Sequence, residues 1–206
     1  MRTVLSPQRI GDDVFEFEVE TAEAAQALAA SLGRHALAED VVPGLDRVAV
    51  RFDPSNDRQV LDWLSGEHDV PPLQPSAAEI LDVPIAYGGK AGPDLAFVCD
   101  ALSLSKAAFI SLHTQSIHRV EMIGFTPGFA YISGLSEDAQ IPRLKDPRPR
   151  VAAGSVGISS AYTGIYALAG PGGWPLIGQT NLDLFLAERE PAFLLTPGQR
   201  IRFKAV

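Results

Sequence analysis

Hydrophobic and charged residues alternate at two places in the first half of the chain. Residues 15–20 alternate phenylalanine or valine with glutamate, and Val48, Val50 and Phe52 repeat the period with other residues between them. A period of two is typical of a strand that buries one face and exposes the other to water. We therefore expect two half-buried strands in this half of the chain.

Two helices are predicted between and after these strands. The first starts at Thr21, whose hydroxyl can cap free backbone N–H groups, and runs through an alanine-rich stretch to Gly33. The second starts at Pro54, which suits a first helical turn, and its apolar residues share one face. These elements predict a small α+β domain over residues 1–82. The proline-rich segment from His68 to Pro84 is expected to connect it to the rest of the chain.

The second half has a different character. A short strand is predicted from Val83, followed by two short helices over residues 93–102 and 105–112. Residues 124–180 then contain ten glycines and six prolines among recurring short apolar runs. This composition favours a sheet or barrel with many tight corners. We therefore expect a mainly β domain over residues 83–206.

Charge is spread unevenly between the two halves. Residues 1–82 hold 6 basic and 16 acidic residues, whereas residues 83–206 hold 11 basic and 9 acidic ones. The net charge of −8 argues against a nucleic-acid partner, because neutralising phosphates requires a basic face. The asymmetry suggests two units with different roles.

The sequence also bears on location. No apolar run approaches the roughly 20 residues that span a bilayer, and the first residues lack the apolar region of a secretory signal. We therefore expect a cytoplasmic protein without membrane contact. The single cysteine, Cys99, cannot form an internal disulfide, and its apolar neighbours predict a buried thiol.

A cationic run extends from Pro142 to Arg150 and contains four basic residues and one acid. Its prolines restrict the backbone, so that Arg143, Arg148 and Arg150 can be held ready for a carboxylate or phosphate. The alternative, which has equal weight, is a solvated basic loop or a loop that pairs with the acidic N-terminal domain.

Two glycine-rich segments approach catalytic motifs without matching them. Residues 173–180 resemble a phosphate-binding loop but have Gln179 in place of its lysine, and Ala153 stands where a nucleophile elbow has its first glycine. His113 follows an apolar helix, and neither its spacing to His118 nor the nearby residues indicate a metal site, so we favour a structural role for it. The residues alone therefore predict a ligand surface rather than a reaction.

Three motifs together resemble one known family. They are GFTPGFAYISGL at residues 124–135, IPRLKDPRPRVAAGSVGI at residues 141–158 and TGIYALAGPGGWPLIGQT at residues 163–180. Tyr87-Gly-Gly89 and Leu112-His-Thr114 add smaller matches. The pattern is similar to the family of the 5-oxoprolinase B subunit, also called KipI or allophanate hydrolase subunit 1, and it is specific over the second half of the chain.

The resemblance implies a cyclophilin-like β-barrel after the α+β domain. It implies a subunit of an ATP-dependent 5-oxoprolinase, which opens 5-oxo-L-proline to L-glutamate together with an A subunit and a KipA-like C subunit. ATP is then used by the assembled complex, and the isolated chain is inactive. Two alternatives from the same family are an inhibitor of a sensor histidine kinase and an allophanate hydrolase subunit. The chain departs from the family at Ala152 and Ala167, where proline is frequent, which leaves the subfamily open.

The resemblance also suggests roles for residues of the motifs, although it assigns no catalytic residue. The glycine-aromatic stretch would form the wall of a surface groove, and the arginines of the cationic run would lie near an anionic substrate. The expected substrate-binding residues are Arg143, Arg148, Arg150, His113, Phe125, Phe129 and Tyr131. Trp174, Gly172 and Gly173 are expected at the interface with the C subunit.

Overall fold

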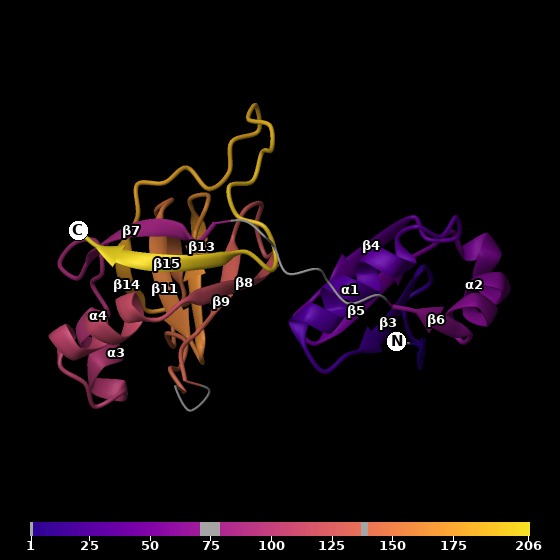
Figure 1. Cartoon of the computed structure of the whole chain (residues 1–206), viewed down its shortest axis with the longest axis horizontal. Helices are drawn as coiled ribbons and strands as arrows, with labels where there is room; N and C mark the ends of the chain where they lie inside the picture. Colours follow the sequence, from indigo (N-terminus) through magenta and orange to yellow (C-terminus); the bar gives the residue numbers. More distant parts are fainter. Residues whose placement is uncertain (1, 71–78, 137–139) are drawn as a thin grey trace. The chain divides into compact units, whose positions relative to one another are not determined.

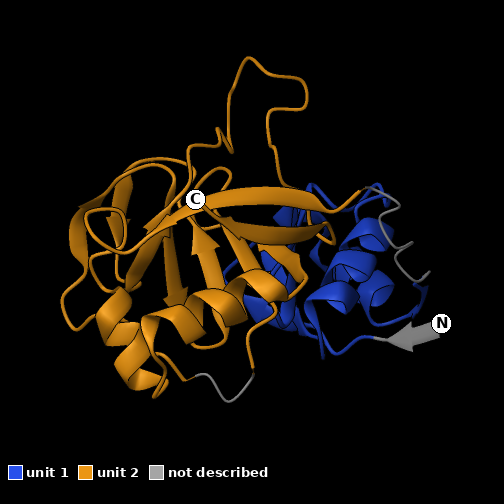
Figure 2. Cartoon of the chain, turned by 60° about the vertical axis from the view of Figure 1, so that its left-hand side comes forward, with its two compact units in different colours: residues 1–75 blue, residues 76–206 orange. Residues whose placement is uncertain are grey.

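A computed structural model describes residues 2–70, 79–136 and 140–206 of the chain. By their internal contacts the residues divide into two compact units, Met1–Pro75 and Ser76–Val206 (Figure 2). The predicted boundary after residue 82 falls inside the strand β7 (Leu81–Tyr87) of the second unit. The central part of the expected connection, residues 71–78, lies outside the described residues.

The first unit is built on a four-stranded antiparallel sheet (Figure 1). In spatial order its strands are β2 (Gln8–Ile10), β3 (Val14–Glu18), β5 (Arg47–Arg51) and β4 (Asp40–Pro43). A separate antiparallel pair joins β1 (Arg2–Val4) to β6 (Glu67–Asp69). The predicted connection therefore begins with a strand residue, His68, whose ring is buried and bonds the Leu64 carbonyl at 3.1 Å.

The helix α1 (Ala22–Leu32) packs on β4 and β5 and covers one face of this sheet. Thr21 caps it as predicted, because its hydroxyl oxygen accepts a hydrogen bond from the Ala24 N–H at 3.1 Å. A turn of 3₁₀ helix, η1 (Pro54–Asn56), leads into α2 (Asp57–Leu64). Strands and helices enclose one core, in which β3 and β5 contribute alternate residues. The predicted α+β character of this half is confirmed.

The second unit contains a closed barrel, which agrees with the barrel that the sequence motifs imply. Its strands, in order around the barrel, are β11 (Ser155–Ser159), β12 (Tyr162–Ile165), β9 (Ala130–Ser133), β8 (His118–Ile123), β15 (Arg200–Ala205), β7 and β14 (Leu176–Gln179). Neighbours are antiparallel except β15 and β7, which run parallel. Outside the barrel, β10 (Arg148–Val151) pairs with β13 (Gly170–Gly172).

Two helices of the second unit follow β7, as the sequence predicts. They are α3 (Leu95–Ala101) and α4 (Lys106–Gln115), and α4 packs on β15. Ser105 caps α4 through a 3.1 Å bond from the Ala108 N–H, and the helix extends past the predicted end to include His113. Among the described residues no single helix is long and apolar enough to cross a membrane, although α3 and α4, bent by 87°, pass that test as a pair.

The barrel wall is covered on both faces. Along β9, Ala130 and Ile132 belong to the inner core, whereas Tyr131 between them packs in a second cluster on the outer face. This outer aromatic cluster comprises Phe129, Tyr131, Val151, Tyr162, Tyr166, Trp174 and Leu176. It includes Val151 of β10, so the outer strand pair helps to enclose it. The second unit therefore has two hydrophobic layers separated by one sheet.

Two paired glycines provide the floor of the outer aromatic cluster. Gly157 of β11 lies opposite Gly164 of β12. A Cβ on Gly164 would lie 2.6 Å from the Trp174 and Phe129 rings, and one on Gly157 would lie 3.0 Å from the Trp174 Cβ. The absent side chains leave room for the indole to lie directly on the sheet. Glycines of this half of the chain therefore not only form tight corners, as the composition predicts, but also allow a side chain to pack closely on the sheet.

Candidate functional site

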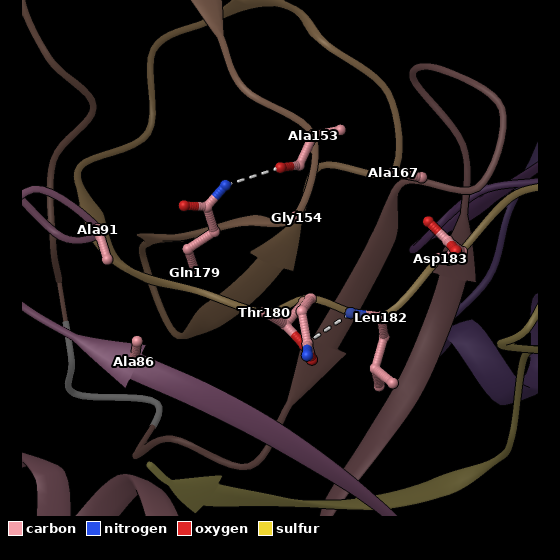
Figure 3. Close-up of a pocket in the computed structure, with 10 residues that line it drawn as sticks. Ala86, Ala91, Ala153, Gly154, Ala167, Gln179, Thr180, Leu182 and Asp183 are labelled. Carbon is pink, nitrogen blue, oxygen red and sulfur yellow. Dashed lines mark hydrogen bonds between the residues drawn. The ribbon is translucent and has the colours of Figure 1, made fainter.

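A pocket of about 480 Å³ lies beside the end of β14 (Figure 3). The residues that line it come from two of the three sequence motifs, residues 141–158 and 163–180, and from neighbouring segments. They are Ala86, Ala91, Ala153, Gly154, Ala167, Gln179, Thr180, Asn181, Leu182 and Asp183. Segments more than ninety positions apart in the sequence therefore meet at one place.

Backbone hydrogen bonds fix the two loops that form the pocket wall. The Thr180 N–H donates to the Gly154 carbonyl at 2.8 Å, and the Gly154 N–H donates to the Tyr166 carbonyl at 2.7 Å. Gly154 has φ +78°, and a side chain there would lie against the Thr180 carbonyl oxygen. Only glycine combines this conformation with this approach. The pocket wall therefore depends on the glycine of the AAGSVG segment.

Small side chains keep the pocket open. Four of its lining residues are alanines. Behind one of them, Ala167, stands the turn of the GFTPGF segment, since a Cβ on Gly128 would lie 2.8 Å from the Cβ atoms of Ala167 and Phe185. The GFTPGFAYISGL segment thus supports the pocket from outside and contributes no lining residue.

Four polar side chains line the pocket, those of Gln179, Thr180, Asn181 and Asp183. The Gln179 Nε2 donates to the Ala153 carbonyl at 3.0 Å, which turns the Gln179 Oε1 away from Ala153 (Figure 3). The Thr180 hydroxyl oxygen accepts from the Leu182 N–H at 3.3 Å. The Asp183 carboxylate has no hydrogen bond or ion pair within the described part of the chain. No lysine or arginine is among the described residues that line the pocket, so it offers hydrogen bonds but no positive charge.

The arginines of the cationic run lie elsewhere and do not act together. Arg148 is held by Asp94, whose carboxylate accepts from the Arg148 Nη2 at 2.7 Å and from the Leu176 N–H at 2.7 Å. The Arg148 and Asp94 side chains are 29% and 15% exposed, and the Arg148 Nη1 is buried without a partner. Arg148 therefore ties β10 to the start of α3, which differs from the free guanidinium expected from the sequence.

The other two arginines are exposed and form no hydrogen bond or ion pair among the residues that the structure describes. Burial raises the pKa of Tyr131, and the nearby Arg143 opposes that shift, which places Arg143 beside the outer aromatic cluster. Arg150 is exposed on β10. Arg143 and Arg150 are thus open to anions, but neither lines the pocket.

The aromatic residues of the GFTPGF segment separate into an inner and an outer set. Phe129 is 2% exposed and packs edge-on against Tyr131 and Trp174, at ring distances of 5.0 and 5.6 Å. Phe125 is 64% exposed and has φ +68°, within a γ-turn that the Thr126 N–H closes onto the Gly124 carbonyl at 2.8 Å. This conformation is strained for a bulky residue. Only Phe125 of this group presents a largely exposed ring.

The residues expected at a partner interface are also packed inside. Trp174 is 7% exposed at the centre of the outer aromatic cluster, because the two glycines beneath it let the indole sink onto the sheet. Gly172 is buried under the Tyr166 hydroxyl, and the Gly173 carbonyl accepts from the Leu144 N–H at 2.7 Å. These three residues hold the cationic loop against the barrel rather than presenting an apolar surface.

His113 is fully buried between α4 and the barrel. Its Nδ1 lies 2.6 Å from the Tyr87 hydroxyl and its Nε2 lies 2.9 Å from the Thr163 hydroxyl, while its ring stacks on Phe203 at 4.3 Å. Burial, followed by the influence of His118, lowers the pKa of His113 well below the ordinary value. The imidazole therefore joins three chain segments and is out of reach of a substrate. Among the described residues no group of acidic, histidine or cysteine side chains could hold a metal ion.

Sequence reasoning did not select the polar residues of the pocket. The sequence marks Gln179 only as the residue in the place of a phosphate-loop lysine, and no motif points to Thr180 or Asp183 as a binding residue. A signal was present, because the AAGSVG and GWPLIGQT segments both belong to the recognised motifs. What the sequence does not reveal is that Gly154 and Thr180 are hydrogen-bonded neighbours.

Comparisons with known proteins agree with these motifs. The family model of the carboxyltransferase domain, subdomain C and D, matches residues 8–195. Proteins named as the B subunit of 5-oxoprolinase, from Escherichia coli O157:H7 and Bacillus subtilis (strain 168), are 45% identical over 131 residues and 44% identical over 124 residues. These matches cover 64% and 60% of this chain, and 60% and 52% of the relatives. The chain thus spans little more than half the length of these curated relatives.

Solved structures resemble the chain over nearly all of its length. The protein TTHA0988 is 32% identical with a TM-score of 0.76, covering 94% of this chain and 39% of that one. The conserved uncharacterized protein PH0987 from Pyrococcus horikoshii is 31% identical with a TM-score of 0.60, covering 98% and 97%. The Kluyveromyces lactis urea carboxylase is 18% identical with a TM-score of 0.74, covering 98% and 22%, and at that identity it shares the fold alone.

Proposed function

The chain belongs to the family of the carboxyltransferase domain, subdomain C and D, and from this premise we propose that it is a subunit of an ATP-dependent 5-oxoprolinase. In this proposal the assembled enzyme opens 5-oxo-L-proline to L-glutamate together with the A and C subunits. The names of the relatives that are 42–45% identical support the activity. The observation that carries the proposal is that the recognised motif segments, far apart in sequence, build one small polar pocket.

The pocket suits part of a small amide substrate better than a nucleotide. Its alanine walls leave space for a compact ring, and its side chains supply hydrogen bonds. A triphosphate requires cations or a loop of backbone N–H groups, whereas this pocket has no described cation and one carboxylate, that of Asp183. The residues therefore do not fit ATP. We expect ATP to bind another chain of the complex and assign it no step in this one.

A protruding hairpin is our candidate for contact with a partner chain. It comprises Leu184–Leu194, follows directly on the pocket residue Asp183, and stands away from the barrel between β14 and β15 (Figures 1 and 2). Its two arms are joined by the Leu194 N–H to Leu184 carbonyl bond at 2.9 Å and by the Leu186 N–H to Ala192 carbonyl bond at 3.0 Å.

One arginine holds this hairpin in shape. The Arg189 guanidinium donates to four backbone carbonyls, those of Asp183, Leu184, Pro191 and Ala192, at 2.9–3.4 Å. Two apolar side chains, Leu186 and Phe193, remain 40% and 39% exposed. Ordered apolar groups beside a pocket favour a partner that completes the site, because ordering them in advance lowers the cost of binding.

The test is reconstitution with the A and C subunits. We expect ATP-dependent glutamate release from the three-component mixture and none from this chain alone. Ala153→Leu, which fills the pocket, should lower kcat/KM about tenfold or more, since each tenfold change corresponds to about 1.4 kcal/mol. The matched control is Ala152→Leu, an exposed neighbour that does not line the pocket.

The outcomes separate clearly. Turnover by the isolated chain would contradict a shared site. Equal activity of the two alanine variants would remove the pocket from the site. A complete mixture that forms no glutamate, while this chain still binds a sensor kinase, would replace the proposal with the regulatory alternative.

A further inference from the structure

The side chains that line the pocket differ in whether they can accept or donate a hydrogen bond. The Gln179 Oε1 and the Asp183 carboxylate present acceptor oxygens without a described donor, and the Asn181 amide in the same lining has both an acceptor and donors. The Thr180 hydroxyl already accepts from the Leu182 N–H and keeps its own proton for donation. A ligand N–H or O–H donor can therefore be accepted by Gln179 or by Asp183.

The orientation of Gln179 is fixed by its neighbour. A carbonyl oxygen can only accept, so the group 3.0 Å from the Ala153 carbonyl has to be the amide Nε2 of Gln179. The Oε1 is then the atom turned away from Ala153 (Figure 3). The position of Ala153 is fixed by the next residue, Gly154, whose backbone forms hydrogen bonds with the backbones of Thr180 and Tyr166. The acceptor is thus positioned by the backbone of two motif segments.

We infer that Gln179 sets the orientation of the substrate, by accepting the lactam N–H of a five-membered cyclic amide at its Oε1. This inference rests on the proposed function for the identity of the lactam. A peptide-like N–H is a strong donor, and a fixed acceptor favours it over an analogue that lacks it.

The same groups place the carboxylate of the substrate outside the pocket. The Asp183 carboxylate repels a second carboxylate, and no described lining residue supplies a cation to offset that repulsion. The carboxylate of a bound lactam acid therefore points to the mouth. A cation from another chain has to meet it there, so the site of this chain is one half of the complete site.

Three small ligands test the inference on the chain as it stands. They are 2-pyrrolidone, which has the N–H and no carboxylate, N-methyl-2-pyrrolidone, which has neither, and 5-oxoproline, which has both. Titration followed by amide NMR shifts of Gly154 and Thr180 gives each Kd. We expect N-methylation to weaken binding about three- to tenfold, the range of one net hydrogen bond, and 5-oxoproline to bind no more tightly than 2-pyrrolidone.

A variant that adds a charge distinguishes two reasons for weaker binding of N-methyl-2-pyrrolidone, the lost hydrogen bond to Gln179 and a steric clash of the methyl group. Gln179→Lys keeps a donor for the Ala153 carbonyl, removes the acceptor and adds a cation. In this variant the difference between the two pyrrolidones should disappear, and 5-oxoproline should become the tightest ligand. Gln115→Lys is the matched control, because Gln115 is exposed at the end of α4, where its amide bonds Ser111.

Each outcome is decisive. Equal binding of both pyrrolidones to the native chain, tightest binding of 5-oxoproline to it, or discrimination that persists in Gln179→Lys overturns the inference. Absence of binding at these residues also overturns it. N–H-dependent binding combined with a reconstituted mixture that forms no glutamate supports the inference and refutes the proposed function, whereas activity without N–H dependence does the reverse.

Discussion

The sheets of the two units are used in different ways. In the first unit one face of β3 packs into the core through Phe15 and Phe17, while Glu16 on the other face pairs with Arg47 at 2.7 Å. In the second unit all five residues of β11 are buried, since the barrel wall has a core on each side. A sheet covered on both faces can hold a pocket in fixed backbone, and a half-solvated sheet is less suited to that.

The ion pairs differ in exposure, and the second unit has an exposed pair of its own, Arg202 with Asp82 at 3.0 Å. The first unit carries pairs on its solvated face, such as Arg51 with Glu39 at 3.0 Å, where the side chains are 51% and 46% exposed. The second unit encloses Arg148 and Asp94 at 29% and 15% exposure. Water screens the first kind, whereas the second fixes the position of a strand. The comparison therefore predicts that equivalent substitutions have larger effects in the barrel unit.

The largest effect is expected from Trp174→Ala. Removing the centre of the outer aromatic cluster should lower the free energy of unfolding of the second unit by about 3–5 kcal/mol. The chain has two tryptophans, so in this variant the fluorescence of Trp63 alone measures unfolding of the first unit. Hydrogen exchange of the amides of β11 and β12 measures unfolding of the second unit. An unchanged barrel together with lost binding of the C subunit would show instead that Trp174 anchors the interface.

Filling the glycine floor should have a smaller effect. Gly164→Ala places a methyl group 2.6 Å from the Trp174 and Phe129 rings and should cost about 1–3 kcal/mol by overpacking. Gly170→Ala is the matched control, because nothing lies within 4 Å of the added carbon, and a change within about 0.5 kcal/mol is expected. Urea unfolding measures both. Equal losses in the two variants would contradict the close contact.

The enclosed and exposed ion pairs can be compared directly. Arg148→Ala leaves the Asp94 carboxylate with one partner and should cost about 1–3 kcal/mol. Arg51→Ala removes an exposed pair, for which about 0–1 kcal/mol is typical, and about 1 M salt should abolish that difference. If Arg148→Ala instead lowers kcat/KM of the reconstituted enzyme at unchanged stability, the arginine contacts the substrate.

The smallest effect is expected from pH. Because burial first, and then His118, lowers the pKa of His113, the unfolded state binds more protons than the folded state below the ordinary value of 6.5. The contribution to stability is complete above that value and decreases as the pH falls below it. His113→Gln should reduce this slope between pH 7 and 5 in thermal melts. An NMR titration in which the native His113 ring protonates near pH 6.5 would contradict the prediction without any substitution.

Local sequence was sufficient wherever one face of an element meets water. Alternation along residues 15–20 predicted β3, Thr21 predicted the cap of α1, and Ser105 predicted that of α4. Each of these features depends on neighbours within a few positions, which the sequence displays directly. The barrel was indicated by composition and by the recognised motifs, but not its strand order or its second core.

What the sequence determined by itself is therefore the family, the α+β and barrel character of the halves, and the segments that matter. The tertiary structure decided which residues of those segments reach a ligand. Trp174 and His113 are inside, Arg148 is neutralised by a partner 54 positions away, and Gln179 is oriented by Ala153, 26 positions away. The physical reason is that burial and hydrogen bonding depend on distances in space. Only the closed barrel, which brings Gly154 against Thr180, sets those distances.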